Sequence, residues 1–121
     1  MKSEGKKIFI ELLSADNFCK DYVKWMNDSE ITQYLESRWR SFSLDDIKNY
    51  IRDINESNKE FLFGIFYNEN DKHIGNIKIG DISYIHRYGD IGLLIGNKEY
   101  WGKGIATEAI KLITEYAFEE L

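Results

Sequence analysis

Residues 90–110, which read DIGLLIGNKEYWGKGIATEAI, decide how this chain is expected to fold. Residues 90–96 are mostly apolar and predict a strand. A gapped glycine pair, Gly102-Lys103-Gly104, follows shortly after it. From about Gly104 to the end of the sequence, apolar side chains recur at helical spacing, namely Ile105, Ala109, Leu112, Ile113 and Tyr116. The stretch therefore predicts a strand, a glycine-rich turn and a helix in succession.

The glycine-rich turn has the chemistry of an anion site. Glycine lets consecutive backbone N–H groups turn inward around an anion. The helix that follows adds its unpaired N–H groups and the positive end of its dipole, and Lys103 adds a formal charge. We therefore predict that this turn binds phosphate.

Other kinds of glycine-rich turn fit less well. A P-loop requires Lys-Ser or Lys-Thr after the glycines, and Ile105-Ala106 stands after Gly104. The dinucleotide fingerprint requires a third small residue where Thr107 stands. It also requires an acid about 20 residues further on in a parallel βαβ unit, and the sequence ends before that position. The remaining alternative is a strand-to-helix turn that binds no ligand.

The rest of the sequence predicts alternating strands and helices. A helix is expected to begin after Ser43, because Ser43 and Asp46 resemble a capping box. Residues 60–67 are apolar at successive positions, which favours a central strand that is covered on both faces. We expect the three consecutive strands between residues 60 and 96 to be antiparallel and to be framed by helices. In chain order, the expected elements are a strand at 8–13, a helix at 15–27, a short helical turn at 28–35, a helix from 43 to about 54, strands at 60–67, 73–84 and 90–96, and the final helix.

Composition excludes several classes of protein. The chain has 121 residues, the size of one domain. One cysteine, Cys19, excludes an internal disulfide framework and a zinc-ribbon ligand set, so we expect a reducing, cytoplasmic setting. No apolar run approaches the roughly 18 residues of a membrane helix. The net charge of −5 argues against a non-specific nucleic-acid binder, because such a protein needs a basic face.

Residues 91–96 followed by 99–110 closely resemble the acetyl-CoA motif of the GNAT superfamily of N-acetyltransferases. Residues 100–109 (YWGKGIATEA) and 25–31 (WMNDSEI) are similar to the branch that contains ribosomal-protein N-terminal and amino-sugar acetyltransferases. The resemblance implies an α/β, acyl-CoA N-acyltransferase-like fold with a mixed, mainly antiparallel sheet flanked by helices. It also implies acetyl-CoA as the co-substrate. The predicted function implies no metal.

The resemblance assigns roles in cofactor binding. Trp101 stands in place of the family's Gln or Arg, and the pyrophosphate is expected on the backbone amides of Trp101, Gly102, Lys103, Gly104, Ile105, Ala106 and Thr107. In the family the preceding strand is bulged and splayed, and the pantetheine arm pairs with its backbone, which here implies Leu93, Leu94 and Ile95. The Leu94 amide is expected to hydrogen-bond the thioester carbonyl and to stabilise the developing oxyanion.

The resemblance also suggests how the acceptor is handled. Some members use a carboxylate at the start of this strand as general base, and that position is Asp90. A base is needed, directly or through water, because an amine attacks only when unprotonated. Trp39, His86 and Arg87 are candidate contacts of the acceptor. His86 is also a candidate base, and Arg87 is also a candidate phosphate contact. The expected acceptor is a primary amine, either a protein N-terminus or an amino sugar.

Four further side chains receive structural interpretations. His73 is expected on the surface beside a turn, and Cys19 is expected to pack within a helix. Tyr100 is expected to pack against the glycine-rich turn together with Trp101, and Tyr116 is expected in the core.

The family normally continues with another strand, a helix and further strands. We therefore expect residues 1–121 to form the N-terminal two-thirds of a single acetyltransferase domain, truncated at its C-terminal side. The alternative to an enzyme is a non-catalytic CoA-binding or interaction fragment. An uncovered sheet edge would favour association, so a homodimer is also considered, whereas no nucleic-acid or membrane partner is expected.

Overall fold

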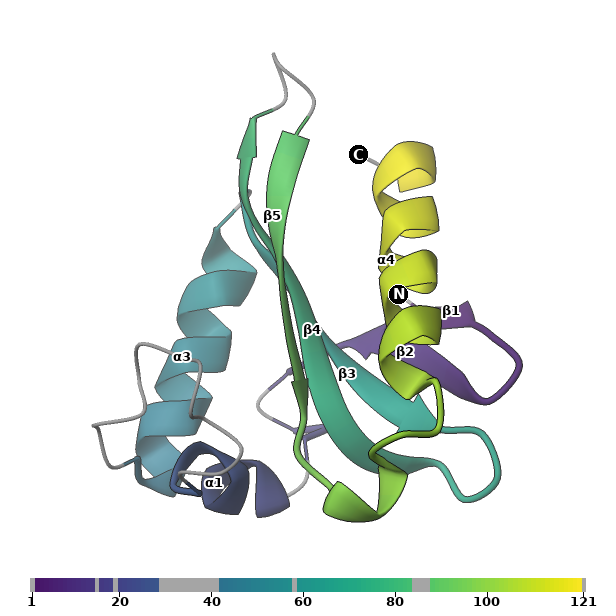
Figure 1. The fold of residues 1–121 in the computed structure, drawn as a ribbon. Coiled ribbons are helices and arrows are strands. Elements are labelled where there is room, and N and C mark those ends of the chain that lie inside the picture. The colour runs from purple at the N-terminus through teal and green to yellow at the C-terminus, as the bar shows by residue number, and fades with distance from the viewer. Residues whose placement is uncertain are drawn as a thin grey trace.

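Five strands form one antiparallel sheet in the order β1-β2-β3-β4-β5 (Figure 1). The computed structural model describes residues 2–14, 16–18, 20–28, 42–57, 59–83 and 88–120. The strands are β1 (Lys2–Glu4), β2 (Ile8–Leu12), β3 (Phe61–Tyr67), β4 (Lys72–Ser83) and β5 (Tyr88–Ile95). The helices are α1 (Asp21–Met26), α3 (Leu44–Glu56) and α4 (Ile105–Glu120), with a short 3-10 turn, η2 (Lys98–Tyr100), between β5 and α4. The expected α/β fold with a mainly antiparallel sheet is confirmed.

The helices cover the sheet on two sides, with α4 on one face and α1 and α3 on the other (Figure 1). β3 is apolar toward both layers. Phe63 and Ile65 pack in the cluster that contains α4, whereas Leu62 and Phe66 pack in the cluster that contains α1 and α3. This double coverage explains the apolar run at residues 60–67, since neither face of the strand meets water. Among the described residues, no helix is both long and apolar enough to cross a membrane.

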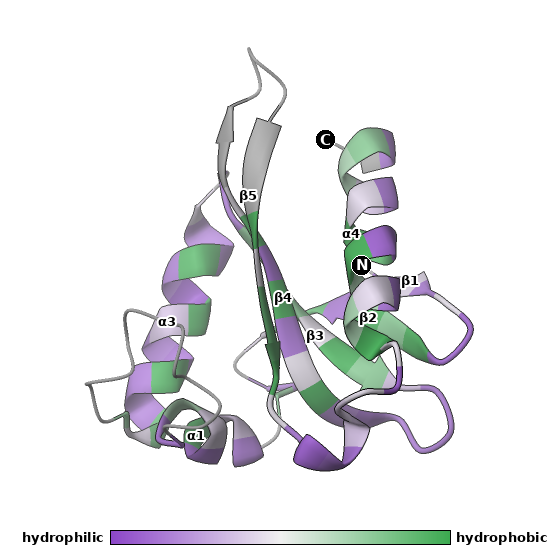
Figure 2. Cartoon of the chain, in the orientation of Figure 1, coloured by the Kyte–Doolittle hydropathy of each residue, from purple (hydrophilic) through white to green (hydrophobic). Residues whose placement is uncertain are grey.

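α3 begins where the sequence predicts it. The Ser43 hydroxyl accepts a hydrogen bond from the Asp46 amide (3.1 Å), and the Asp46 carboxylate accepts one from the Ser43 amide (2.9 Å). This reciprocal capping box satisfies N–H groups that the first turn leaves unpaired. Ile47, Ile51 and Ile54 form the buried side of the helix, and Figure 2 shows hydrophobic bands alternating with hydrophilic ones along it.

α1 begins at Asp21, later than the predicted start at residue 15. The cause is Asn17, whose side chain accepts a hydrogen bond from the Ser14 amide (2.6 Å) and donates one to the Leu12 carbonyl (2.9 Å). Local side-chain bonds of this kind offer the backbone an alternative to the helix.

β1 was not predicted, because Lys2–Glu4 is a polar segment without apolar alternation. It forms through antiparallel pairing with residues 9–11 of β2. The predicted helical turn at 28–35 lies outside the described residues, apart from its first position.

β5 pairs with β4 without interruption from Ile95, opposite Gly75, to Asp90, opposite Gly80. Within these pairs the register shows no bulge, but directly after them the amides of Gly96 (3.0 Å) and Asn97 (3.1 Å) both donate to the Ile74 carbonyl, so the regular pairing of this stretch ends at Gly96. The register shifts lie on β4 instead, one opposite residues 65 and 66 of β3 and the other between Gly80 and Ser83. β4 lies between β3 and β5. At each register shift β4 carries one residue more than the strand that it pairs with, as in a β-bulge.

His73 is buried, which corrects the expectation of a surface position. It is 5% exposed, and its ring lies 5.2 Å from the Trp25 ring, 5.1 Å from the Phe66 ring and 6.3 Å from the Tyr22 ring. Its Nε2 lies 2.7 Å from Asn76 Oδ1. The neighbouring turn is polar, but α1 arrives from a remote part of the chain and covers His73.

Burial should make the stability of the fold depend on His73 in mildly acidic solution. Desolvation lowers the pKa of His73 below its ordinary 6.5, outweighing the bonds with Asn76 and the Gly75 backbone that favour the charged ring. The unfolded chain therefore binds the proton first as pH falls. The free energy of unfolding is expected to decrease below about pH 6.5, by up to ~1.4 kcal/mol per pH unit, with no contribution above about pH 7.5, where the ring is neutral in both states.

Urea denaturation of the wild type and of His73→Gln across pH 5–8 tests this prediction. The difference between the two curves removes the pH dependence that the two proteins share. A difference that does not change between pH 7 and pH 5 would contradict it.

Candidate active site

Two residues with positive φ shape the backbone between η2 and α4. Gly102 has φ +78° and Gly104 has φ +76°. Lys103 between them has negative φ, since Asp71 is the only non-glycine residue with positive φ in the described chain. Alternation of handedness along successive residues turns their N–H groups toward one concave side. The glycines are needed because a side chain at positive φ is strained.

We call residues 102–107 the amide turn, because their N–H groups have no acceptor in the described part of the protein. The amides on either side are satisfied: Trp101 N donates to Lys98 O, and Glu108 N donates to Gly104 O, both at 3.2 Å. Residues 102–104 are exposed, whereas Ile105 is buried and anchors the start of α4. The expected anion site thus has free donors from Gly102 to Thr107, but the Trp101 amide is not among them.

The amide turn is held in place by Lys7 and Ile8, which lie at the junction of β1 and β2. Lys7 Nζ donates to the Lys103 carbonyl (2.8 Å). The Glu108 carboxylate accepts hydrogen bonds from the amides of Lys7 (2.9 Å) and Ile8 (2.8 Å). Sequence reasoning missed this clamp, because the partners are about a hundred residues apart and no local pattern links them. Its effect is to fix α4 and the amide turn against the start of β2.

Removing the charge of Glu108 should weaken the clamp. Glu108→Gln is expected to lower the free energy of unfolding by about 1–2 kcal/mol, because an amide oxygen accepts more weakly than a carboxylate. The matched control is Glu115→Gln on an exposed position of the same helix, for which we expect a change below about 0.5 kcal/mol. Chemical denaturation of the two variants measures the difference, and equal stabilities would contradict a role of Glu108 as a clamp.

β5 lies at one end of the described sheet, and its outer backbone groups have no neighbouring strand among the described residues. Gly96 N donates to Ile74 O of β4 (3.0 Å). Because backbone groups alternate in direction along an antiparallel strand, Leu94 also faces β4, whereas Leu93 and Ile95 face outward. We call the outward backbone groups of Leu93 and Ile95 the open edge. The register therefore does not place the Leu94 amide where an arm pairing with the open edge would meet it.

Tyr100 and Trp101 lie beside the amide turn in different ways. Tyr100 is buried, with its ring 4.7 Å from that of Tyr67, and the Lys103 ammonium lies 5.5 Å from the centre of the Tyr100 ring. Trp101 is 42% exposed, and its indole Nε1 donates to the Ile95 carbonyl (2.7 Å). Tyr116 is in the core, as expected.

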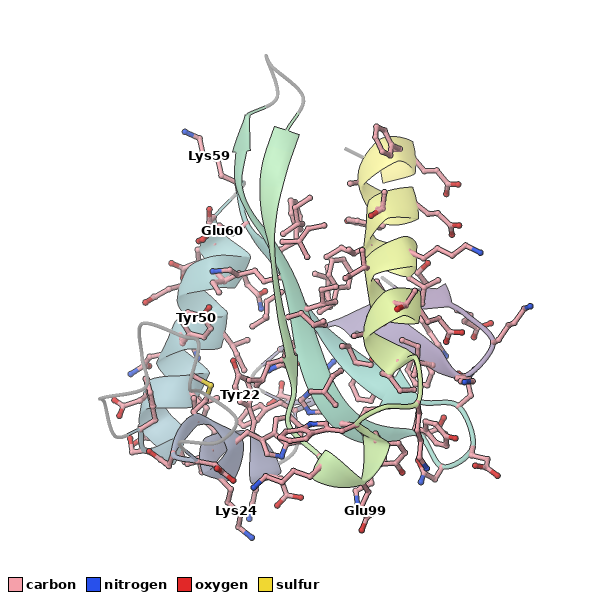
Figure 3. The ribbon with its side chains drawn as sticks, viewed as in Figure 1. Tyr22, Lys24, Tyr50, Lys59, Glu60 and Glu99 are labelled. Carbon is pink, nitrogen blue, oxygen red and sulfur yellow. The ribbon has the colours of Figure 1, made fainter. Side chains whose placement is uncertain are left out.

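The start of β5 lies beside a polar cluster that sequence reasoning did not identify. Lys78 Nζ lies 3.6 Å from Glu60 Oε1 and 3.5 Å from the Tyr50 hydroxyl. Burial alone would lower the pKa of Lys78, but Tyr50 and Glu60 outweigh it and leave the pKa raised. Figure 3 shows Tyr50 and Glu60 on the side of the sheet that α3 covers. Lys78 pairs with Gly92, and a Cβ at Gly92 would have no atom within 4 Å, so this face is open at that point.

The candidate acceptor residues are only partly placed. Asp90 pairs with Gly80, two positions from the Gly92–Lys78 pair, which puts its backbone near this polar cluster. Trp39, His86, Arg87 and Cys19 lie outside the described residues. Within the described part of the chain, no group of three or more His, Cys, Asp or Glu side chains is arranged to hold a metal ion.

The amide turn and the open edge are adjacent and chemically different. The first offers free N–H donors at a helix N-terminus and suits a phosphorylated group, and the second offers the donors and acceptors of a strand. Together they can hold an extended ligand that has a phosphorylated end and an amide-containing arm.

Comparison with known proteins agrees with this geometry. Residues 8–121 match the family described as the Acetyltransferase (GNAT) domain, and the chain belongs to that family. An uncharacterised N-acetyltransferase, p20, of Bacillus licheniformis is 28% identical over 117 residues, which cover 93% of this chain and 61% of that protein. This chain therefore spans less than two-thirds of the length of that relative.

Solved acetyltransferase structures share the fold. A probable acetyltransferase matches with a TM-score of 0.83 and 24% identity, over 99% of this chain and 68% of the other. Spermidine N-acetyltransferase from Vibrio cholerae, in complex with CoA and spermine, matches with a TM-score of 0.79 and 22% identity, over 96% of this chain and 66% of the other.

Proposed function

We propose that this chain binds acetyl-CoA and transfers the acetyl group to a primary amine by direct attack. The observation that carries the proposal is the row of free amides at residues 102–107 beside the open edge of β5. The amide turn suits the diphosphate, because N–H donors at a helix N-terminus favour an anion. The open edge suits the pantetheine arm, because an extended chain with amide groups can pair with it as a strand would. Membership of the GNAT family supports the same assignment.

In this proposal the backbone of β5 positions the thioester. An N–H of the open edge, from Leu93 or Ile95, takes the role that the resemblance gives to Leu94, since the Leu94 amide faces β4. Such a donor stabilises the negative charge that develops on the carbonyl oxygen. The amine nitrogen forms a bond to the carbonyl carbon, the carbon–sulfur bond breaks, and the sulfur leaves as a thiolate. Asp90 accepts the proton that the amine loses, directly or through a water molecule.

We propose a primary amine as acceptor, with a protein N-terminus or an amino sugar as the two classes that the sequence resemblance suggests. An α-amine has a pKa of about 7.7–8.0, so near neutral pH a larger fraction is unprotonated than for a lysine amine. Spermine, which accompanies CoA in the Vibrio cholerae structure, also carries primary amines and belongs in any test. We further propose that residues 1–121 are part of one acetyltransferase domain.

The test combines calorimetric binding of acetyl-CoA with thiol release in the presence of an amine panel. The panel contains a peptide with a free N-terminus, an amino sugar and spermine. We expect acetyl-CoA to bind and one amine to release thiol, and we expect Asp90→Asn to reduce kcat by about a hundredfold or more while acetyl-CoA still binds. Binding without thiol release from any amine would favour a non-catalytic CoA-binding fragment. Absence of binding would overturn the proposal.

A further inference from the structure

Trp101 joins the two halves of the proposed cofactor site. Its backbone directly precedes the amide turn, and its own amide is bonded to Lys98 O (3.2 Å). Its side chain reaches back to β5, where Nε1–H donates to the Ile95 carbonyl at 2.7 Å. This distance is short for an N–H donor to a carbonyl, which indicates a well-formed bond.

The Ile95 carbonyl belongs to the open edge. Ile95 pairs with Gly75 at a position where the ladder bond runs from Gly96 N to Ile74 O, so the N–H and C=O of Ile95 both point away from β4. A carbonyl oxygen has two lone pairs, so it can accept the indole N–H and still accept a second donor from a ligand. The indole therefore bonds to the open edge, and the Ile95 carbonyl can still accept a hydrogen bond from a ligand.

We propose that Trp101 is a positioning residue that sets the amide turn at a fixed separation from the open edge. This inference rests on the proposed function. A ligand that contacts both the amide turn and the open edge binds more tightly when the two are already held at the right separation. The free protein is then ordered in advance, and binding does not have to supply the free energy of ordering it. A ligand that contacts the amide turn alone gains nothing from this tie. Trp101 should therefore matter for coenzyme A and not for a diphosphate that lacks the pantetheine arm.

The experiment compares CoA with ADP by calorimetry. Trp101→Phe removes the indole N–H and keeps an aromatic ring. Trp101→Gln restores an N–H donor at the same number of bonds from Cα. Phe118→Leu removes an exposed aromatic side chain far along α4 and serves as the matched control. Thermal melting confirms that each variant is folded.

We expect Trp101→Phe to weaken CoA about three- to tenfold, as the loss of one hydrogen bond predicts, and to change ADP affinity less than about twofold. Trp101→Gln and Phe118→Leu should keep both affinities within about twofold of the wild type. In the enzyme assay, Trp101→Phe should raise KM for acetyl-CoA and leave kcat unchanged.

Other outcomes would overturn the inference. Equal weakening of CoA and ADP in Trp101→Phe would show a general structural role, and no weakening of CoA would show that the tie is irrelevant. Either result leaves the proposed function standing, provided that the wild type binds CoA. A wild type that binds neither ligand would overturn the proposed function and this inference together.

Discussion

Gly96→Ala is expected to lower the free energy of unfolding by about 3 kcal/mol, a large loss for a single methyl group. Gly96 is buried at the end of β5, and a Cβ built there would overlap the ring of Trp25 in α1. Trp25 is 6% exposed and packs against His73 and Tyr22, so these neighbours restrict any movement of its ring. The overlap can be removed only if α1 shifts away from the sheet or β5 bends. Either movement disturbs the core between α1 and the sheet.

Urea denaturation of Gly96→Ala and Gly92→Ala measures this effect. Gly92 lies in β5, four residues before Gly96, but a Cβ there has no neighbour within 4 Å, so its replacement should cost less than about 1 kcal/mol. In a Trp25→Leu background the cost of Gly96→Ala should fall by more than half, because the overlapping ring is absent. A cost that is equal in both backgrounds would contradict the assigned contact.

Gly104→Ala is expected to weaken ADP and acetyl-CoA at least about tenfold. Alanine at φ +76° costs roughly 1–2 kcal/mol, so the backbone rotates away and the amides of the turn no longer converge. No steric overlap contributes, because the nearest atom to a Cβ on Gly104 is Lys7 Nζ at 3.9 Å. The loss therefore reports backbone conformation alone. Gly102→Ala, at φ +78° with no neighbour within 4 Å, should behave in the same way.

The matched control is Lys103→Ala, which lies between the two glycines and has negative φ. It keeps the backbone conformation and removes one exposed charge, so we expect affinity to fall less than about threefold, and less still at high salt. Calorimetry with ADP and acetyl-CoA on all three variants checks the prediction. If Gly104→Ala binds as the wild type does, the amide turn does not hold the diphosphate.

Several features were predictable because they depend on residues close together in sequence. The capping box of Ser43 and Asp46 needs only a short polar side chain and an acid three positions later. The glycines at 102 and 104 predict a turn with positive φ before an amphipathic helix. The apolar run at residues 60–67 shows that β3 has no face toward water. Local rules govern each of these features, so the sequence is sufficient.

Other features were missed because their partners are remote. His73 follows a polar turn, and only the arrival of α1 buries it. Nothing in the sequence near Glu108 distinguishes it from other glutamates on a helix. Its role depends on hydrogen bonds from the amides of Lys7 and Ile8, which are about a hundred residues away. The tie from Trp101 to Ile95 spans few residues, but it depends on which way the backbone of β5 faces, and pairing with β4 sets that direction.

The sequence by itself determined the existence of the amide turn, since glycine at two positions and a helix start after them are properties of local backbone energetics. Only the tertiary structure decided which strand groups accompany the turn. Alternation along β5 leaves either Leu94 or its neighbours facing outward, and both choices suit the apolar pattern of the chain equally. Long-range pairing with β4 selects Leu93 and Ile95, because hydrogen bonds between strands are satisfied in one register and lost in the other.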